Sequence, residues 1–174
     1  PGQAALASVG GAVEAFEFMP ASYMRRLAEA RPDIRQPFTP RQNVNILVEI
    51  GATAPRDATP HTDGTLPVTA LLEQVLGDLL QDGLVLDAEI AQNEAQRRAM
   101  WERRELAAEI TFARKPVIDT DVALPLENVS LFLERMAARL PDLDKGAEDM
   151  CVAHLGDGNV HFNIASHAQG TGAL

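Results

Sequence analysis

The sequence predicts an α+β protein in which a ferredoxin-like, mostly antiparallel sheet carries helices on one face and leaves the other face open. Segments with a two-residue apolar period alternate along the chain with segments of helical period. Most strand-like segments alternate apolar with polar residues, which is typical of a sheet with one covered face; a purely parallel, doubly wound sheet is the alternative. The last two strands flank a tight Asp-Gly turn, which makes them antiparallel.

The expected elements follow one another with few long loops. Segment 43–50 alternates cleanly, and we expect Val44, Ile46 and Val48 on its buried face. Ser22 is a candidate N-cap for the first helix, and Gly83 is expected to end the second. The expected strands are 13–18, 43–50, 85–90, 117–122, 150–155 and 160–164, and the expected helices begin at Ser22, cover 66–82 and 93–110, and begin at Pro125.

Composition excludes several classes of partner and site. The chain has 174 residues, with 15 Lys and Arg against 25 Asp and Glu, and this acidic balance argues against nucleic acid or an anionic membrane as partner. One cysteine, Cys151, excludes an internal disulfide framework and a Cys-rich zinc site. We expect no transmembrane segment, because no apolar run is long enough. The length fits one domain, and both ends resemble cuts within a longer chain.

The segment from His154 to Asn163 carries the strongest functional signal. If Asp157 and Gly158 form a two-residue hairpin turn, His154 lies directly opposite His161, with Cβ atoms about 4.5–5.5 Å apart. The alternation also places both histidines and Asn163 on the open face. Two imidazoles at that separation can share a metal ion, although a catalytic metal needs a third protein ligand. The alternative is two half-exposed histidines beside a common turn. The opposite, apolar face should pack on the helices and holds Cys151, Ala153, Leu155, Val160, Phe162 and Ile164.

The same segment resembles the H-x-x-D-G-N-x-H-x-N motif of the C-terminal (cap) domain of FAD-linked oxidases. This group contains D-2-hydroxyglutarate dehydrogenase, D-lactate dehydrogenase and the glycolate oxidase flavoprotein subunit. Weaker resemblances lie at 15–19, 100–105 and 121–125, in the family's order. The resemblance implies that residues 1–174 are a single domain, a fragment of that cap domain, with the FAD-binding domain and a C-terminal tail outside the chain.

The resemblance also implies roles for individual residues. His154 and His161 would ligate a divalent metal, Zn²⁺, and Asn163 would help to hold the substrate. Arg104 would pair with the substrate carboxylate, which a guanidinium fork matches bidentately. The catalytic base and the third metal ligand are expected beyond Leu174. Two positions depart from the family: Ala108 stands where members have Thr, and Asp119 stands where several have Lys.

The function implied is that of the substrate- and metal-binding part of an FAD-dependent 2-hydroxy acid dehydrogenase. Such an enzyme oxidises a D-2-hydroxy acid to the 2-oxo acid and passes a hydride to flavin. The expected partners are the 2-hydroxy acid, the chain's own FAD-binding domain and an electron acceptor, with a homodimer as one option. We expect a cytoplasmic protein, or one held at a membrane periphery through the electron acceptor.

Three alternatives stay open beside this function. They are a non-catalytic α+β interaction module, a family member with another substrate and no metal, and a metal-dependent hydrolase that uses the histidine pair. The isolated 174-residue fragment is expected to be inactive, because it has no glycine-rich dinucleotide fingerprint.

Overall fold

The computed structural model describes residues 11–113 and 116–166 of the chain. The chain divides into two compact units: Pro1–Phe16 with Val48–Glu94, and Glu17–Leu47 with Ala95–Leu174. In the first unit, η1 packs against α3, whose end at Gly83 has the expected left-handed φ of 67°. Every residue proposed above for a functional role lies in the second unit. The elements are β1 (Val13–Pro20), α2 (Ala21–Ala30), β2 (Val44–Ile50), the 3-10 helix η1 (Pro55–Ala58), α3 (Pro67–Gln81), α4 (Glu94–Glu105), α5 (Ala107–Phe112), β3 (Val117–Ile118), β4 (Asp121–Ala123), α6 (Leu126–Leu143), β5 (Glu148–His154) and β6 (Asn159–Ala165).

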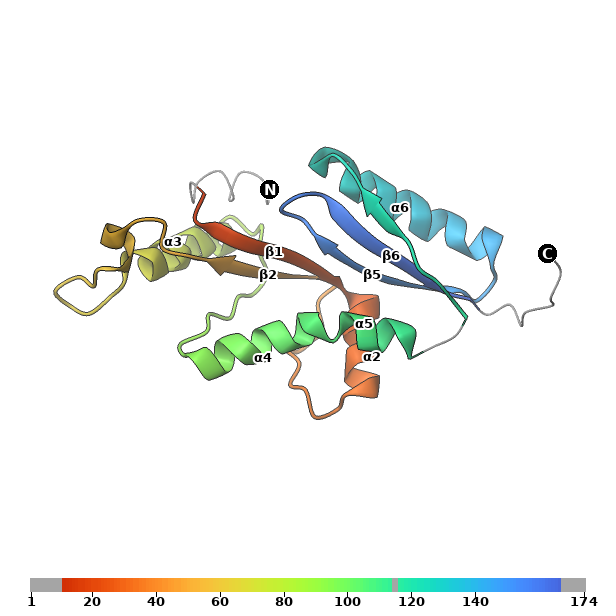
Figure 1. Cartoon of the computed structure of the whole chain (residues 1–174), viewed down its shortest axis with the longest axis horizontal. Helices are drawn as coiled ribbons and strands as arrows, with labels where there is room; N and C mark the ends of the chain where they lie inside the picture. The colour runs from red at the N-terminus through yellow and green to blue at the C-terminus, as the bar shows by residue number, and fades with distance from the viewer. Residues whose placement is uncertain (1–10, 114–115, 167–174) are drawn as a thin grey trace. The chain divides into compact units, whose positions relative to one another are not determined.

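The predicted fold class is confirmed: the chain is an α+β protein with an open, six-stranded sheet. The strand order is β2-β1-β5-β6-β3, and β4 also pairs with β6. Strand β5 is central and runs antiparallel to both β1 and β6 (Figure 1). The strongest sequence signal therefore lies at the centre of the sheet.

Helices pack on both faces of the β5–β6 hairpin. Helix α6 covers the apolar face predicted from the sequence, where Cys151, Phe162 and Val160 are buried. Burial raises the pKa of the Cys151 thiol to about 12, so this residue belongs to the core. On the other face, Met150 and Val152 pack with α2 and α5, because these apolar side chains also need cover (Figure 1). This second face is thus open only in part.

Several local predictions were wrong. Ser22 does not cap a helix: Pro20 is at the N-cap of α2, and the Ser22 hydroxyl donates to Asp149. Segment 85–90 forms no strand. The expected helix 93–110 is broken at Leu106 into α4 and α5, and the expected strand 117–122 is divided into β3 and β4. The break at Thr120 matters, because its backbone N–H turns toward the functional face.

The buried face of β2 is the opposite of the expected one. Val44 is 59% exposed, whereas Asn45 is 6% exposed. The amide of Asn45 donates to the carbonyls of Met19 and Gln42, which compensates for its burial. Leu47, on the same side of the strand, packs against the core that contains Met19. Hydropathy alternation alone selected the wrong side, because a hydrogen-bonded amide occupies the interior.

The hairpin turn is also longer than predicted. His154 pairs with Asn159, and Val152 pairs with His161, so four residues rather than two connect the strands. Gly158 has a φ of 79°, and no described non-glycine residue has a positive φ, which excludes the predicted turn through Asp157. The backbone N–H of Leu124 donates to the carbonyl of Gly158, so the turn is held against the end of β4.

Replacing Gly158 by Ala should therefore destabilise the hairpin. A Cβ there would clash with the carbonyl oxygen of Leu124, and the left-handed backbone adds strain of about 1–2 kcal/mol. We expect Gly158→Ala to lower the free energy of unfolding by about 2 kcal/mol or more. Gly156→Ala is the matched control, since a Cβ at Gly156 meets nothing within 4 Å. Urea denaturation of both variants measures the difference, and equal midpoints would contradict this account of the turn.

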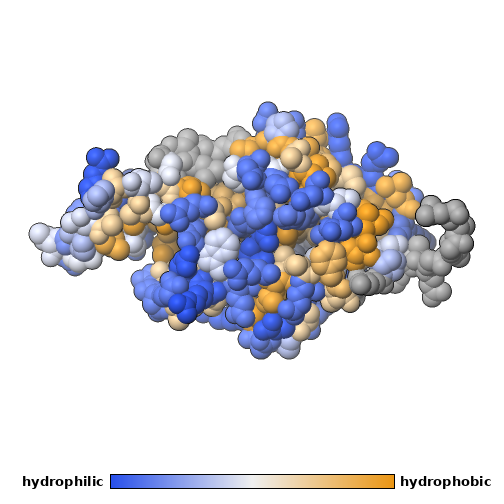
Figure 2. Space-filling view, in the orientation of Figure 1, coloured by the Kyte–Doolittle hydropathy of each residue, from blue (hydrophilic) through white to orange (hydrophobic). Residues whose placement is uncertain are grey.

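The surface near the end of α5 is apolar. Phe112 and Ile118 are both large, exposed hydrophobic residues. Figure 2 shows hydrophilic residues over α4 and hydrophobic residues gathered over α5 and the adjoining strands. The polarity of the surface therefore changes from α4 to α5 (Figure 2).

Candidate functional site

His154 and His161 lie side by side on the partly open face of the sheet. Their ring centroids are 5.1 Å apart with an interplanar angle of 79°, and their side chains are 40% and 33% exposed. They are diagonal rather than direct cross-strand neighbours, because the true register differs from the predicted one by two residues. A shift of two residues keeps every side chain on its face, whereas a shift of one would have separated the rings. The predicted proximity of the rings is confirmed, although the predicted pairing was wrong.

Glu17 links His154 to Arg104. Glu17 is 5% exposed and pairs with His154 in the register of β1 and β5, so the two side chains share a face. One carboxylate oxygen, Oε1, lies 2.8 Å from Nδ1 of His154. The other, Oε2, accepts a hydrogen bond of 2.8 Å from Nε of Arg104. A buried carboxylate needs such partners, and each bond to a charged group is of the strong kind.

His161 has a carboxylate partner of its own. Asp121 of β4 pairs with His161 of β6, and its Oδ1 lies 3.0 Å from Nδ1 of His161. A ring that donates its Nδ1–H to a carboxylate presents Nε2 as an acceptor or metal ligand. Both histidines therefore contact a carboxylate through Nδ1 and have Nε2 on the opposite side of the ring. Arg104 approaches His154 at Nε2, and its Nη2 lies 3.4 Å from that atom.

Asn163 is buried beside the two rings. Its Oδ1 accepts a hydrogen bond of 3.0 Å from the backbone N–H of Thr120, at the break between β3 and β4. The hydroxyl of Thr120 in turn donates to the carbonyl of Phe162. The bond to Oδ1 fixes the amide so that its NH₂ group is directed away from Thr120. Asn163 thus combines a structural role with a place in the wall of a cleft.

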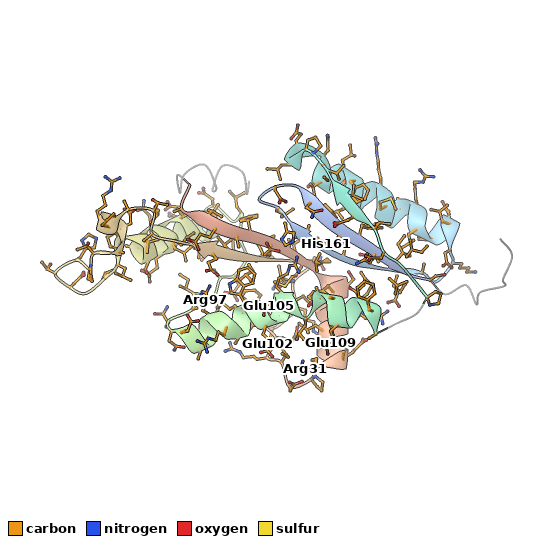
Figure 3. The ribbon with its side chains drawn as sticks, in the orientation of Figure 1. Arg31, Arg97, Glu102, Glu105, Glu109 and His161 are labelled. Atoms are coloured by element: carbon orange, nitrogen blue, oxygen red, sulfur yellow. The ribbon has the colours of Figure 1, made fainter. Side chains whose placement is uncertain are left out.

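A cleft of about 350 Å³ lies between the helices α4 and α5 and the sheet. Its volume suits a small organic acid. Figure 3 shows His161 on the sheet, facing these helices. Of the predicted site residues, Arg104, His161 and Asn163 line the cleft, while His154 contacts both Arg104 and His161. The lining residues are Arg104, Ala107, Ala108, Thr111, Phe112, Asp119, Asp121, Val152, His161 and Asn163.

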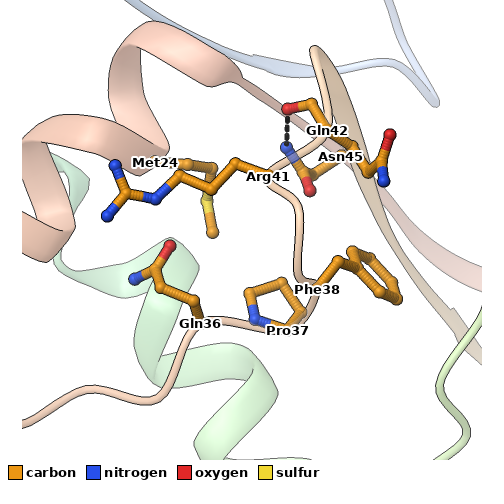
Figure 4. Close-up of a pocket in the computed structure, with 7 residues that line it drawn as sticks. All are labelled: Met24, Gln36, Pro37, Phe38, Arg41, Gln42 and Asn45. Atoms are coloured by element: carbon orange, nitrogen blue, oxygen red, sulfur yellow. Dashed lines mark hydrogen bonds between the residues drawn. The ribbon is translucent and has the colours of Figure 1, made fainter.

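A second hollow, next to α2, is too closed to hold a ligand. It lies between Met24 and the loop from Gln36 to Gln42, and it has no room for a water molecule (Figure 4). Both amide atoms of Gln36 are buried, and neither has a hydrogen-bond partner within the described chain. We therefore place the candidate site in the larger cleft.

The described residues contain no complete metal site. No group of three or more His, Cys, Asp or Glu side chains among residues 11–113 and 116–166 is placed to hold a metal ion. The two Nε2 atoms fit two ligand positions, since each ring is oriented by a carboxylate, as is usual for metal-binding histidines.

Sequence reasoning missed two of the groups that orient the site, Asp121 and Thr120; Glu17 was a candidate only as a supporting group on the open face. Glu17 and Asp121 each hold one histidine, and Thr120 holds Asn163. Each of these contacts joins segments far apart in the chain through the pairing of strands. Their signal is the sheet register, which the spacing of residues within one segment does not contain.

The chain belongs to the family of FAD linked oxidases, C-terminal domain, whose model matches residues 3–173. It is 32% identical over 159 residues to the D-2-hydroxyglutarate dehydrogenase, mitochondrial, of Arabidopsis thaliana, covering 91% of this chain and 26% of that protein. A putative mitochondrial D-lactate dehydrogenase of Schizosaccharomyces pombe is 37% identical over 107 residues, or 56% of this chain and 20% of the relative. The D-2-hydroxyglutarate dehydrogenase of Stutzerimonas stutzeri is 28% identical over 153 residues, or 86% of this chain and 30% of the relative.

These relatives are all much longer than the chain, which spans less than a third of each. The family membership confirms the resemblance inferred from the motif at His154–Asn163. Among the described helices, none is long and apolar enough to span a membrane.

We expect Glu17→Gln to destabilise the protein and loosen the site. The change removes the negative charge that pairs with the nearly buried Arg104. It also replaces one of the two carboxylate oxygens, which contact Arg104 and His154, by an NH₂ group that cannot accept. An unpaired buried charge costs about 3 kcal/mol, and the amide compensates only in part, so a loss of about 2 kcal/mol is expected in urea denaturation. Asp33→Asn, which removes an exposed partner of Arg31, is the control and should leave the midpoint unchanged. A stability of Glu17→Gln equal to that of the unmodified protein would contradict the linking role of Glu17.

Proposed function

We propose that this chain is the substrate-binding part of an FAD-dependent 2-hydroxy acid dehydrogenase. The observation that carries the proposal is the convergence of one guanidinium, one imidazole and one amide on a single cleft, with a second imidazole, that of His154, in contact with the first. These groups come from α4, β5 and β6, which the fold brings together. The family membership supports the reaction class, because the matched relatives are named as dehydrogenases of 2-hydroxy acids.

Arg104 is the residue proposed to bind the substrate carboxylate. Its Nε is already bonded to Glu17, so the side chain is held in one orientation, and its two terminal nitrogens can bind a second acid if Nη2 exchanges Nε2 of His154 for that acid. A guanidinium binds a carboxylate through two parallel bonds, which also fixes the direction of the substrate. Preorganisation of this kind lowers the cost of binding, because the arginine does not have to be ordered again.

Asn163 and the two histidines are proposed to bind the substrate at its hydroxyl group. A 2-hydroxy acid carries its hydroxyl on the carbon next to the carboxylate, so an acid on Arg104 brings its hydroxyl toward the imidazole pair. The NH₂ group of Asn163 can donate to the hydroxyl or carbonyl oxygen there. Oxidation removes a proton from the hydroxyl oxygen and a hydride from the carbon that bears it, and leaves a 2-oxo acid; a base takes up the proton, and FAD, when bound, accepts the hydride.

We further propose that Nε2 of His154 and Nε2 of His161 are two ligands of a divalent metal, with Zn²⁺ as the metal best suited to imidazole. At least one more ligand must come from residues outside the described ranges, since a catalytic site needs three. When bound, such a metal lowers the pKa of the substrate hydroxyl. Arg104 would have to move its Nη2 away from His154 for the ring to accept the metal.

Other properties of the whole protein are proposals of the same kind. Most of the length of the relatives has no counterpart in this chain, so we propose that FAD is bound by a separate domain. The electron acceptor and a homodimer stay predictions. The names of two relatives contain the word mitochondrial, and that of the Stutzerimonas stutzeri relative names no compartment. The predicted cytoplasmic location therefore has no support from them and needs cell fractionation.

Anaerobic reduction of bound flavin by D-2-hydroxy acids tests the proposed function in the full-length protein. We expect bleaching of the flavin absorbance on addition of the correct acid. Arg104→Lys should raise KM at least about tenfold with a smaller change in kcat, because lysine cannot bind a carboxylate through two parallel bonds. A full-length protein that contains no flavin would instead favour a non-catalytic interaction module.

Metal content provides an independent test of the histidine pair. We expect His161→Ala to lower the zinc content of the purified full-length protein by at least about tenfold, as measured by elemental analysis, without loss of flavin. His154→Ala should do the same. His61→Ala is the control, because His61 lies in the exposed loop of the first unit. Unchanged zinc in both site variants, or no zinc in the unmodified protein, would rule out the metal.

A further inference from the structure

The two ends of the cleft are lined by residues of different chemistry. Arg104 lies at the end near the two histidines, and Phe112 lies eight residues further along the chain, at the end of α5. On the facing wall, Asp121 lies at the level of His161, and Asp119 lies beyond it toward β3. The end of the cleft away from Arg104 is therefore formed by Ala108, Thr111, Phe112 and Asp119.

The charges of this lining are mostly negative. Among the residues that the structure describes in the cleft wall, Arg104 carries the one permanent positive charge, and Asp119 and Asp121 carry two negative charges. Glu17, bonded to Arg104 from behind, adds a further negative charge. The site thus offers one cationic position for an acid, and that position is next to the imidazoles.

We propose that this cleft selects 2-hydroxy acids with a single carboxylate and a neutral, apolar remainder, and discriminates against dicarboxylic 2-hydroxy acids. This inference rests on the function proposed above and names the substrate class within it. The carboxylate binds Arg104, and the remainder of the molecule extends toward Ala108 and Phe112. The exposed Phe112 ring and the Ala108 methyl group offer apolar contact there, beside Thr111 and Asp119.

A second carboxylate on the substrate would be directed toward Asp119. Two carboxylates a few ångströms apart repel one another, and a negative group leaves water only for a site that supplies a partner. Within the described lining, that end of the cleft supplies a carboxylate instead of a cation. Since Asp119 and Asp121 are exposed, solvent and salt weaken the repulsion, and we expect discrimination of about tenfold rather than complete exclusion.

The proposed substrate class therefore differs from the acid for which two of the matched relatives are named. The Arabidopsis thaliana and Stutzerimonas stutzeri proteins are named for D-2-hydroxyglutarate, which is a dicarboxylate. The Schizosaccharomyces pombe protein is named for D-lactate, which has one carboxylate and a methyl group. The wall of the present cleft is suited to an acid of the second chemical kind.

The test compares kcat/KM of the full-length flavoprotein for D-lactate and D-2-hydroxybutyrate with that for D-2-hydroxyglutarate and D-malate. We expect at least about tenfold higher values for the monocarboxylates, with the ratio falling as ionic strength rises. Asp119→Asn should raise the ratio of kcat/KM for D-2-hydroxyglutarate to that for D-lactate about fivefold. Asp142→Asn, on the exposed end of α6, removes the same charge outside the cleft and should leave the ratio unchanged.

The outcomes separate the two proposals. Faster turnover of the dicarboxylates by the unmodified protein would overturn the selection inferred here and leave the proposed function standing. An equal effect of Asp119→Asn and Asp142→Asn would remove Asp119 as the cause and overturn the inference in the same way. Flavin that none of the four acids reduces would overturn the proposed function, and the selectivity with it.

Discussion

The site depends on one buried carboxylate. Glu17 enters the interior on β1, opposite His154 on β5, and its two oxygens bond a histidine and an arginine that belong to different layers of the fold. Sheet pairing sets the position of the first partner, and helix α4 delivers the second. A single side chain thus fixes the ring orientation of His154 and the direction of Arg104, because a carboxylate buried to this extent is stable only when both oxygens are bonded.

Orientation by carboxylates is repeated on the neighbouring strand. Asp121 holds His161 as Glu17 holds His154, so both rings present Nε2 on the partly open face. The two carboxylates differ in burial: Glu17 is inside, whereas the Asp121 side chain is mostly exposed. The contact at His154 is therefore protected from water, and the contact at His161 borders the cleft. Position relative to the helices, rather than residue type, accounts for this difference.

Two elements that the sequence predicts as continuous are interrupted next to the cleft. The break at Leu106 separates α4 from α5, and the break between β3 and β4 turns the backbone of Thr120 toward Asn163. Neither break follows from hydropathy, since 93–110 has a helical pattern throughout and 117–122 has a strand pattern. Pairing with β6 and packing on the sheet decide where each element ends, and these are contacts between distant segments.

The sequence by itself determined the α+β class, the β5–β6 hairpin, the face shared by His154 and His161, and the family, because alternation and a local motif are properties of neighbouring residues. It misplaced the hairpin register by two residues, which happens to preserve the face of every side chain. Only the tertiary structure decided which carboxylate holds each histidine, which side of β2 is buried, and how charge varies along the cleft. Each of these depends on pairing between strands and helices far apart in the chain, and a pattern read along one segment holds no information about its partner.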